Sequence, residues 1–259
     1  MITSVQNPKI KRLVKLRDRK NRVSQEIFSV EGEREISRAL LSGYQIFELY
    51  VCDDYCSLSA TTVIEGVSPD SLFYLSKDAF AKATVRSNSD GLIAVFHSKS
   101  FELEDLNLNG KNLLILENIE KPGNLGALLR TADGAGIGAV ISVDSPLDLY
   151  NPNVIRSSLG AAFSVPFVSS SLERVVAFLR DNNYRIVAAS PNAELPYFKS
   201  DLREGAAILL GSEAEGVSSK ALSFADQKVT IPMLGVADSL NVSVAGAVLI
   251  YESLRQSSI

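Results

Sequence analysis

GSEAEGVS, residues 211–218, follows the apolar run AAILL and has almost the spacing of a phosphate-binding loop. Such a loop needs a lysine after its second glycine, because the ammonium group and the backbone N–H groups together neutralise phosphate oxygens. Val217 stands at that position, and the carboxylates of Glu213 and Glu215 would repel an anion. The glycine-rich turn at the end of an apolar strand therefore predicts a ligand site, but not a phosphate site.

The second half of the chain alternates apolar runs with helical patterns. Strands are predicted at NLLILEN, GAVISV, YRIVAAS, AAILLG and KVTIPM, the last stopping at Pro232, and helices near residues 124–136, 171–183 and 239–255. Continuous apolar strands separated by helices are typical of a parallel sheet covered on both faces. We therefore predict an α/β domain over residues 110–259, with its ligands at the carboxyl ends of the strands.

Three loops rich in Gly, Ser and Asn follow strands of this domain. They are GSEAEGVS, KPGNLGALLRTADGAG (residues 121–136) and IPMLGVADSLN (residues 231–241). Asn124 could cap one following helix, which Gly136 would end, and Asp238 or Ser239 could cap the other. A dinucleotide fingerprint has its glycines before the helix, whereas Gly134 and Gly136 fall at the end of the helix after KPGN, which argues against a dehydrogenase or an NTPase. The loops suit an adenosine-containing ligand that bears an amino acid and no phosphate.

The first part of the chain has a smaller α/β pattern. IFSVEG, QIFELYVC, SLFYLS and GLIAVFH read as strands, and EREISRALLSG and KDAFAKAT read as helices. A polar stretch near residues 98–111 is the expected linker to the parallel-sheet domain. We therefore divide the chain into residues 1–100 and residues 110–259.

Basic residues are concentrated near the N-terminus. From Lys9 to Arg22 there are eight basic residues and one acidic residue, whereas acidic residues outnumber basic ones 29 to 18 elsewhere. A basic arm on an otherwise acidic protein indicates contact with a polyanion such as RNA, while a solvated helix face explains the charge alone equally well. The candidate RNA contacts are Lys9, Lys11, Arg12, Lys15, Arg17 and Arg19.

The sequence has no signal for a membrane, a disulfide framework or a metal. Apolar runs stay below the ~18 residues of a transmembrane helix, and the N-terminus carries no apolar signal region. Cys52 and Cys56 form a CxxxC pair without a second pair of ligands, which makes a poor zinc site. We expect a cytoplasmic protein with no metal and no membrane partner.

The three loops resemble the ordered motifs of the SpoU (TrmH) family of RNA ribose 2′-O-methyltransferases, within the SPOUT superfamily. The likeness covers residues 112–254 and rests on KPGNLGALLRTADGAG, LLGSEAEGVS and IPMLGVADSLNVSVAGAVLIYE. Residues 28–97, and FSVEGEREISRAL above all, are similar to the small ribosomal-protein-like substrate-binding domain often attached to this family. The resemblance implies a deep C-terminal trefoil knot, S-adenosylmethionine as cofactor, and a homodimer with its active site at the subunit interface.

The resemblance also assigns roles to individual residues. Arg130 would be the catalytic arginine, and the polar groups that position the substrate and partner residues would be Asn124, Glu213, Ser239 and Asn241. The cofactor site would be lined, largely through the backbone, by Leu210, Gly211, Ile231, Met233 and Leu240. A guanidinium is a poor proton acceptor, so we expect Arg130 to stabilise the developing alkoxide.

The substrate that the resemblance implies is structured RNA. Members with the extra domain most often modify rRNA and minimal members act on tRNA, so rRNA 2′-O-methylation is the expected function and tRNA ribose methylation the alternative. A non-catalytic RNA-binding protein that keeps the fold is a further alternative. It predicts RNA binding without cofactor binding.

Overall fold

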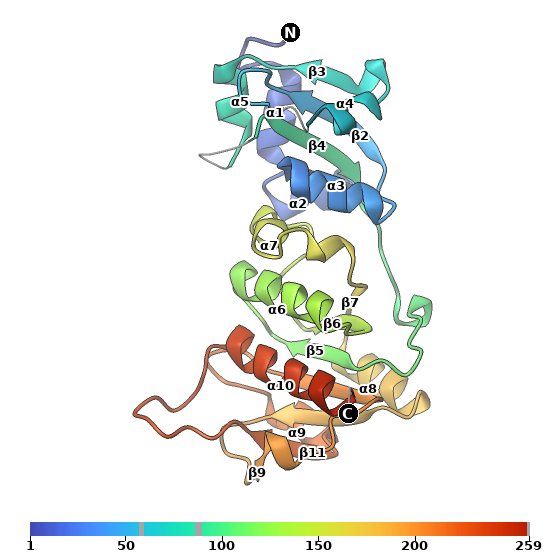
Figure 1. The fold of residues 1–259 in the computed structure, drawn as a ribbon, viewed down its shortest axis with the longest axis vertical. Helices are drawn as coiled ribbons and strands as arrows, with labels where there is room; N and C mark the ends of the chain where they lie inside the picture. The colour runs from blue at the N-terminus through green and yellow to red at the C-terminus, as the bar shows by residue number, and fades with distance from the viewer. Residues whose placement is uncertain (57–59, 86–89, 258–259) are drawn as a thin grey trace. The chain divides into compact units, whose positions relative to one another are not determined.

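The computed structural model describes residues 1–56, 60–85 and 90–257. Its contacts divide the chain into two compact units, residues 1–99 with 148–164 and residues 100–147 with 165–259 (Figure 1). The first unit is therefore discontinuous in sequence, because it includes a segment from the middle of the chain. In the part of the chain that the structure describes, no helix is both long and apolar enough to cross a bilayer.

The first unit is built on a four-stranded sheet. The strand order is β1 (Ile27–Glu31), β4 (Leu92–His97), β2 (Ile46–Val51) and β3 (Leu72–Tyr74). β4 is antiparallel to β1 and β2, whereas β2 and β3 are parallel. Its first helices are α1 (Pro8–Lys15), α2 (Arg19–Gln25), α3 (Glu33–Leu41), α4 (Thr61–Glu65) and α5 (Lys77–Ala83). The strands and helices predicted for this part of the chain are confirmed.

The basic N-terminal segment is folded rather than extended. It forms α1 and α2, and Ile10, Leu13 and Leu16 are buried with α5 against one face of the sheet. The Asn7 side chain caps α1 by accepting from the Lys9 N–H at 2.9 Å. Because the apolar residues recur every third position, α1 buries one face and turns several of its cations outward.

The segment 148–164 completes the aromatic core on the other face of this sheet. It forms α7 (Pro152–Ser157) and the 3-10 turn η4 (Ala161–Phe163). The Tyr150 ring stacks on Phe28 with centroids 4.1 Å apart, and its hydroxyl donates to the Lys99 carbonyl at 2.7 Å and accepts from the Lys99 N–H at 2.8 Å. The segment is thereby anchored to the N-terminal strands.

The second unit contains a seven-stranded sheet in which all paired strands are parallel. The strand order is β7 (Phe167–Ser170), β6 (Ala139–Val143), β5 (Leu113–Glu117), β10 (Ala206–Leu210), β8 (Arg185–Ala189), β11 (Gln227–Thr230) and β9 (Leu195–Pro196). The predicted α/β fold with a parallel sheet is confirmed. β11 ends at Thr230, two residues before the predicted end, because Pro232 has no N–H for a ladder bond.

Helices cover both faces of the large sheet. They are α6 (Pro122–Gly134), α8 (Leu172–Asp181), α9 (Ser219–Phe224) and α10 (Val242–Ser257). α8 and α9 pack on one face, around Ile115, Ile141 and Leu209. α6 and α10 lie side by side on the opposite face (Figure 1), where a Cβ on Gly246 would come within 2.3 Å of the Leu128 side chain. The glycine therefore permits the close approach of these two helices.

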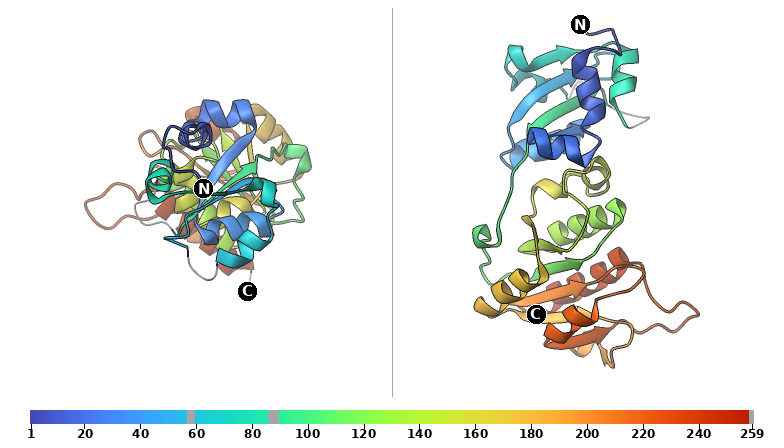
Figure 2. Two further views of the ribbon diagram at one scale, coloured as in Figure 1. Left: turned by 90° about the horizontal axis from the view of Figure 1, so that it is seen from above. Right: turned by 180° about the vertical axis from the view of Figure 1, so that it is seen from behind.

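The predicted linker and one loop of the second unit have features of their own. Residues 98–111, predicted as a linker, contain the 3-10 turn η3 (Leu103–Asp105), and Leu103 is buried in the core beneath α8. The segment between β11 and α10 projects away from the rest of its unit in both views (Figures 1 and 2).

Candidate active site

A cavity of about 440 Å³ lies at the carboxyl ends of β8, β10 and β11. Its volume falls within the range of roughly 300–1,000 Å³ that is common for small-molecule sites. The five residues predicted to line a cofactor site all border it, namely Leu210, Gly211, Ile231, Met233 and Leu240. The loop after β8, with Ser190, Pro191 and Asn192, also borders the cavity and was not predicted. Two of the predicted loops therefore converge on this cavity, as the parallel sheet requires.

The turn after β10 follows a tight path that depends on its two glycines. The N–H of Ser212 donates to the Gly216 carbonyl at 3.1 Å, and the N–H of Gly216 donates to the Ser212 carbonyl at 3.0 Å. A Cβ on Gly211 would lie 2.0 Å from the carbonyl carbon of Gly216. Gly216 itself has a φ of +69°, in the left-handed region that favours glycine. Backbone atoms of the turn can consequently approach a ligand closely.

Glu117, which sequence reasoning missed, fixes the far end of this turn. It is the last residue of β5, and its buried carboxylate accepts from the N–H of Ser218 at 2.8 Å and from its hydroxyl at 2.6 Å. Ser218 in turn caps α9 by accepting from the Ala221 N–H at 3.1 Å. A carboxylate at the end of the apolar run LLILE was the available signal for this position.

The charge of the cavity wall excludes one class of ligand. Among the described residues that line it there is no lysine or arginine, whereas Glu213, Glu215 and Asp238 border it. A phosphate group would meet no compensating cation there, while a ligand that carries a positive sulfur would be attracted by the carboxylates. The lining therefore fits a sulfonium-bearing nucleoside better than a nucleotide.

A second cavity of about 340 Å³ adjoins the first. The two share residues 212–215 as a wall, and the second is also lined by residues 118–121 and by Asn124. The first loop motif, which follows β5, therefore borders the second cavity rather than the first. Together the two cavities bring all three predicted loops to one site.

Glu213 joins the three loops through its carboxylate. Lys121 forms an ion pair with Oε2, while the side-chain amides of Asn124 and Asn241 donate to Oε1 at 2.5 and 2.6 Å. The hydrogen bond from Lys121 is the main cause that lowers the pKa of Glu213, and partial desolvation opposes it. Glu213 is consequently ionised near neutral pH, and both of its oxygens are occupied. Lys121 was not among the predicted site residues.

The side chain of Asn124 is committed to this cluster and does not cap α6. The helix begins at Pro122, after Lys121 in the cap position, because the fixed φ and missing N–H of proline suit the first helical position. The prediction that Asn124 caps the helix is therefore wrong. Gly136 has a φ of +71° just after the helix, as predicted for a C-terminal glycine.

Asn241 caps α10, where Asp238 or Ser239 was predicted to do so. Its side-chain oxygen accepts from the Ser243 N–H at 3.0 Å and from the Ser243 hydroxyl at 2.6 Å, and α10 begins at Val242, three residues later than predicted. Asn241 caps the helix in preference to Asp238 or Ser239, because its side-chain oxygen can accept from Ser243 while its amide nitrogen donates to Glu213. Ser239 borders the larger cavity but forms no part of the Glu213 cluster.

Arg130 lies apart from both cavities. It is an exposed residue of α6, six positions after Asn124, and lines neither of them. Six residues turn a helix by about 240° beyond a full revolution, so Arg130 and Asn124 occupy different sides of α6. Of the five residues predicted to be catalytic, the structure therefore gathers Asn124, Glu213 and Asn241 in one cluster, with Ser239 nearby.

Four of the six basic residues predicted to contact RNA have charged or hydrogen-bonding partners inside the first unit. The guanidinium of Arg17 donates to three carbonyls at the end of α5, at 2.9 to 3.1 Å. The other three pair with acids of the same unit: Lys9 and Arg12 with Glu48, and Arg19 with Asp148. The remaining two, Lys11 and Lys15, are exposed on α1.

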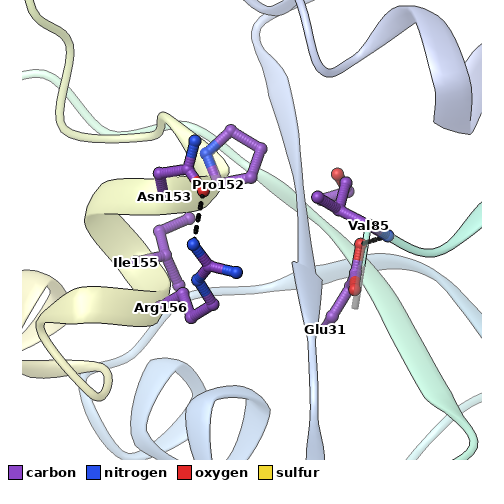
Figure 3. A pocket seen from close by; sticks show the side chains of 7 residues that line it. Glu31, Val85, Pro152, Asn153, Ile155 and Arg156 are labelled. Atoms are coloured by element: carbon purple, nitrogen blue, oxygen red, sulfur yellow. Dashed lines mark hydrogen bonds between the residues drawn. The ribbon is translucent and has the colours of Figure 1, made fainter. Parts of the chain in front are cut away.

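A third cavity, in the first unit, is too small for an organic ligand (Figure 3). Its volume is about 20 Å³, which holds little more than one water molecule. Beside it Arg156 donates to Asn153 at 3.0 Å, and the Glu31 carboxylate accepts from the Val85 N–H at 2.7 Å. Within the described residues, no three His, Cys, Asp or Glu side chains are placed to hold a metal ion.

Known proteins resemble this chain in both units. Residues 111–251 match the model of the SpoU rRNA Methylase family, and residues 7–94 match the MRM3-like substrate binding domain. The 23S rRNA (guanosine(2553)-2′-O)-methyltransferase RlmP of Bacillus subtilis (strain 168) is 31% identical over 250 residues, which cover 96% of this chain and 97% of RlmP.

Solved structures of RNA methyltransferases also resemble this chain over nearly its whole length. The crystal structure of an RNA 2′-O ribose methyltransferase has a TM-score of 0.87 at 41% identity and covers 98% of each chain. The SpoU methyltransferase AviRb from Streptomyces viridochromogenes, in complex with the cofactor AdoMet, has a TM-score of 0.88 at 25% identity, over 96% of this chain and 98% of AviRb.

Proposed function

The chain belongs to the SpoU rRNA methylase family, and we propose that it transfers a methyl group from S-adenosylmethionine to a ribose 2′-hydroxyl of rRNA. The observation that carries this proposal is the convergence of the three loops on two adjoining cavities, joined by the Glu213 carboxylate. RlmP is named for a guanosine of 23S rRNA, and its whole-length match favours rRNA over tRNA and a guanosine as the acceptor.

In this proposal the larger cavity holds the cofactor. Leu210, Gly211, Ile231, Met233 and Leu240 would line the adenosyl part, and the carboxylates at the rim would attract the charged sulfur. When bound, S-adenosylmethionine supplies an electrophilic methyl carbon. The glycine-rich turn would hold the ligand by backbone groups, which explains why no lysine is needed there.

The smaller cavity would receive the target ribose. Because residues 212–215 line both cavities, the two adjoin along this turn. A hydroxyl held in the smaller cavity would lie next to a donor held in the larger one, and positioning of this kind supplies much of the rate of a transfer reaction. Glu213 is poorly suited to accept the proton, since its pKa is lowered and its oxygens are occupied. Its role would be to hold Asn124 and Asn241 in place, with Ser239 contacting the bound ligands from the third loop.

We further infer a homodimer in which Arg130 of one chain completes the site of its partner. Arg130 borders neither cavity of its own chain, and its permanent positive charge suits the stabilisation of a developing alkoxide. Leu234 and Val236, in the projecting loop before α10, are 101% and 105% exposed. Apolar side chains exposed to that degree are expected where a second subunit covers them.

The remaining features of the proposal follow from the family resemblance. The second unit would carry the trefoil knot in its C-terminal part, and the first unit would bind RNA. The RNA-binding and methyltransferase domains would be residues 1–100 and 110–259, with residues 148–164 packed into the first unit. Since its substrate would be rRNA, the protein would act in the cytoplasm.

Methyl transfer from radiolabelled S-adenosylmethionine tests the proposed activity. With rRNA fragments and tRNA offered separately, we expect label in rRNA, and mass spectrometry should locate it on a ribose. Label in tRNA alone would overturn the choice of substrate. RNA binding without cofactor binding in calorimetry would instead indicate a non-catalytic RNA-binding protein.

Mixed dimers test the shared site. Arg130→Ala should keep its cofactor affinity and lose roughly 10²- to 10³-fold in methyl transfer, and Glu213→Ala should also be inactive. When the two variants are co-expressed, one site of each mixed dimer has both residues intact, so about a quarter of the wild-type activity should return. Co-expression of two differently tagged Arg130→Ala chains is the control. No recovery in the mixture would place Arg130 in the site of its own chain.

A further inference from the structure

We propose that the first unit contains a stacking site for an unpaired RNA base, formed by Phe47 and His97 beside the cationic side chains of α1. The proposal rests on the proposed function only in taking RNA as the ligand. It concerns a surface that lies outside the two cavities and that the motif residues do not include.

A β-bulge brings Phe47 to this surface. The register between β2 and β4 shifts between Ile46 and Glu48, so Phe47 is an extra residue without a partner on β4. Ile46 and Leu49 pack on the core of one face, whereas Glu48 pairs with α1 on the other. The bulge places Phe47 on the same side as Glu48, where its side chain is 36% exposed. Bulges often redirect a side chain in this way at functional sites.

Phe47 and His97 form an exposed aromatic pair. Their ring centroids are 5.2 Å apart with an interplanar angle of 79°, and His97 is the exposed last residue of β4. The guanidinium carbon of Arg12 lies over the Phe47 ring, 5.2 Å from its centroid. Exposed rings next to an arginine are the combination on which single-stranded nucleic acids stack their bases.

The cations beside the rings are held in position by a buried acid. Glu48 is 7% exposed and pairs with Arg12 and, at 2.6 Å, with the ammonium group of Lys9. The Tyr50 hydroxyl donates to Glu48 and accepts from Arg12 at 3.2 Å. Because these side chains are already ordered, a ligand would bind them at little cost in conformational entropy. Glu48 neutralises only one of the two cations, so the cluster of Glu48, Lys9 and Arg12 keeps a net positive charge.

Two further lysines complete the surface for a nucleic acid. Lys11 and Lys15 are exposed on α1, and no ion pair holds either of them within the residues that the structure describes. Lysines contact phosphates without reading sequence, whereas a stacked base must be unpaired to reach a ring. The site therefore predicts a preference for single-stranded over double-stranded RNA.

Tryptophan fluorescence tests this site directly, because the chain contains no tryptophan. In Phe47→Trp we expect the emission to be quenched by a 12-nucleotide single-stranded RNA and much less by the duplex of the same sequence. Tyr55→Trp is the matched control. Tyr55 is an exposed aromatic residue beyond the opposite end of β2, with the ammonium group of Lys77 5.9 Å from its ring, and we expect no quenching there.

Binding affinities complete the test. Phe47→Ala should weaken the binding of the same oligonucleotide about tenfold, as expected for the loss of one base stack, whereas Phe47→Tyr and Tyr55→Ala should bind it as the wild type does. Circular dichroism and thermal unfolding check that each variant is folded. An unquenched Phe47→Trp, or wild-type RNA affinity in Phe47→Ala, would overturn the stacking site even if methyl transfer is observed. Quenching without methyl transfer to any RNA would overturn the proposed function alone.

Discussion

Substitution of Gly211 by alanine tests whether the turn after β10 requires close backbone contact. The added Cβ would lie 2.0 Å from the carbonyl carbon and oxygen of Gly216 and 2.1 Å from the nitrogen of Val217, whereas such atoms keep at least 3.0 Å apart. These neighbours are backbone atoms, so relief requires the Gly216 peptide to move by about 1 Å, an overpacking that costs about 1–3 kcal/mol. That shift would also strain the two hydrogen bonds between Ser212 and Gly216, each worth about 1 kcal/mol.

We expect Gly211→Ala to weaken S-adenosylmethionine binding about 10- to 100-fold, since about 1.4 kcal/mol corresponds to a factor of ten. Isothermal titration calorimetry measures the affinity, and thermal unfolding shows how much of the cost falls on the fold. Gly123→Ala is the matched control, because a Cβ there meets nothing within 4 Å. A Gly211→Ala protein that binds the cofactor within threefold of the wild type would refute the proposed packing of this turn.

Three other predictions concern packing, charge and the discontinuous unit. Gly246→Ala should lower the free energy of unfolding by about 1–3 kcal/mol in urea denaturation, and combining it with Leu128→Ala should cost less than the sum of the single losses. The lowered pKa of Glu213 means that its carboxylate stabilises the fold above its unfolded pKa of about 4.3 and that this contribution is lost as the pH falls through the folded pKa. Lys121→Met should therefore raise the pKa of Glu213, which NMR titration of the Glu213 carboxyl carbon measures. On acidification, this variant should lose cofactor binding at a higher pH than the wild type does. An unchanged titration of Glu213 would contradict the ion pair. Tyr150→Phe keeps the stacked ring but loses three hydrogen bonds, two to the Lys99 backbone and one to the Tyr44 hydroxyl, so the free energy of unfolding of the first unit should fall by about 1–3 kcal/mol. An unaltered urea midpoint would argue against those bonds.

The parallel sheet could be predicted because its central strands are buried on both faces and read as unbroken apolar runs. LLILE and AAILL are of this kind, and they pair in the structure as β5 and β10. The absence of a lysine after Gly216 argues against a phosphate site from the sequence alone. The residues assigned to the cofactor, such as Ile231 and Leu240, do border the cavity, although their roles stay proposals.

Features that depend on tertiary contact could not be predicted. Lys121 reads as an ordinary loop residue, and only the fold brings it to Glu213, 92 positions away. Asparagine is a common helix cap, but Pro122 takes the first helical position. The side-chain amide of Asn124 is therefore available to bond the Glu213 carboxylate. The bulge at Phe47 has no sequence signal either, because IFELYV reads as an ordinary strand without a glycine to mark the extra residue.

The contribution of residues 148–164 to the first unit has a consequence for synthesis of the chain. A ribosome translates from the N-terminus, so Phe28 and its neighbours emerge long before Tyr150 and Phe163 are available to cover them. By the time these aromatic rings leave the exit tunnel, β5 and β6 have already been translated. Until then, the part of this apolar face that α3 does not cover stays open to solvent, and a chaperone would bind there.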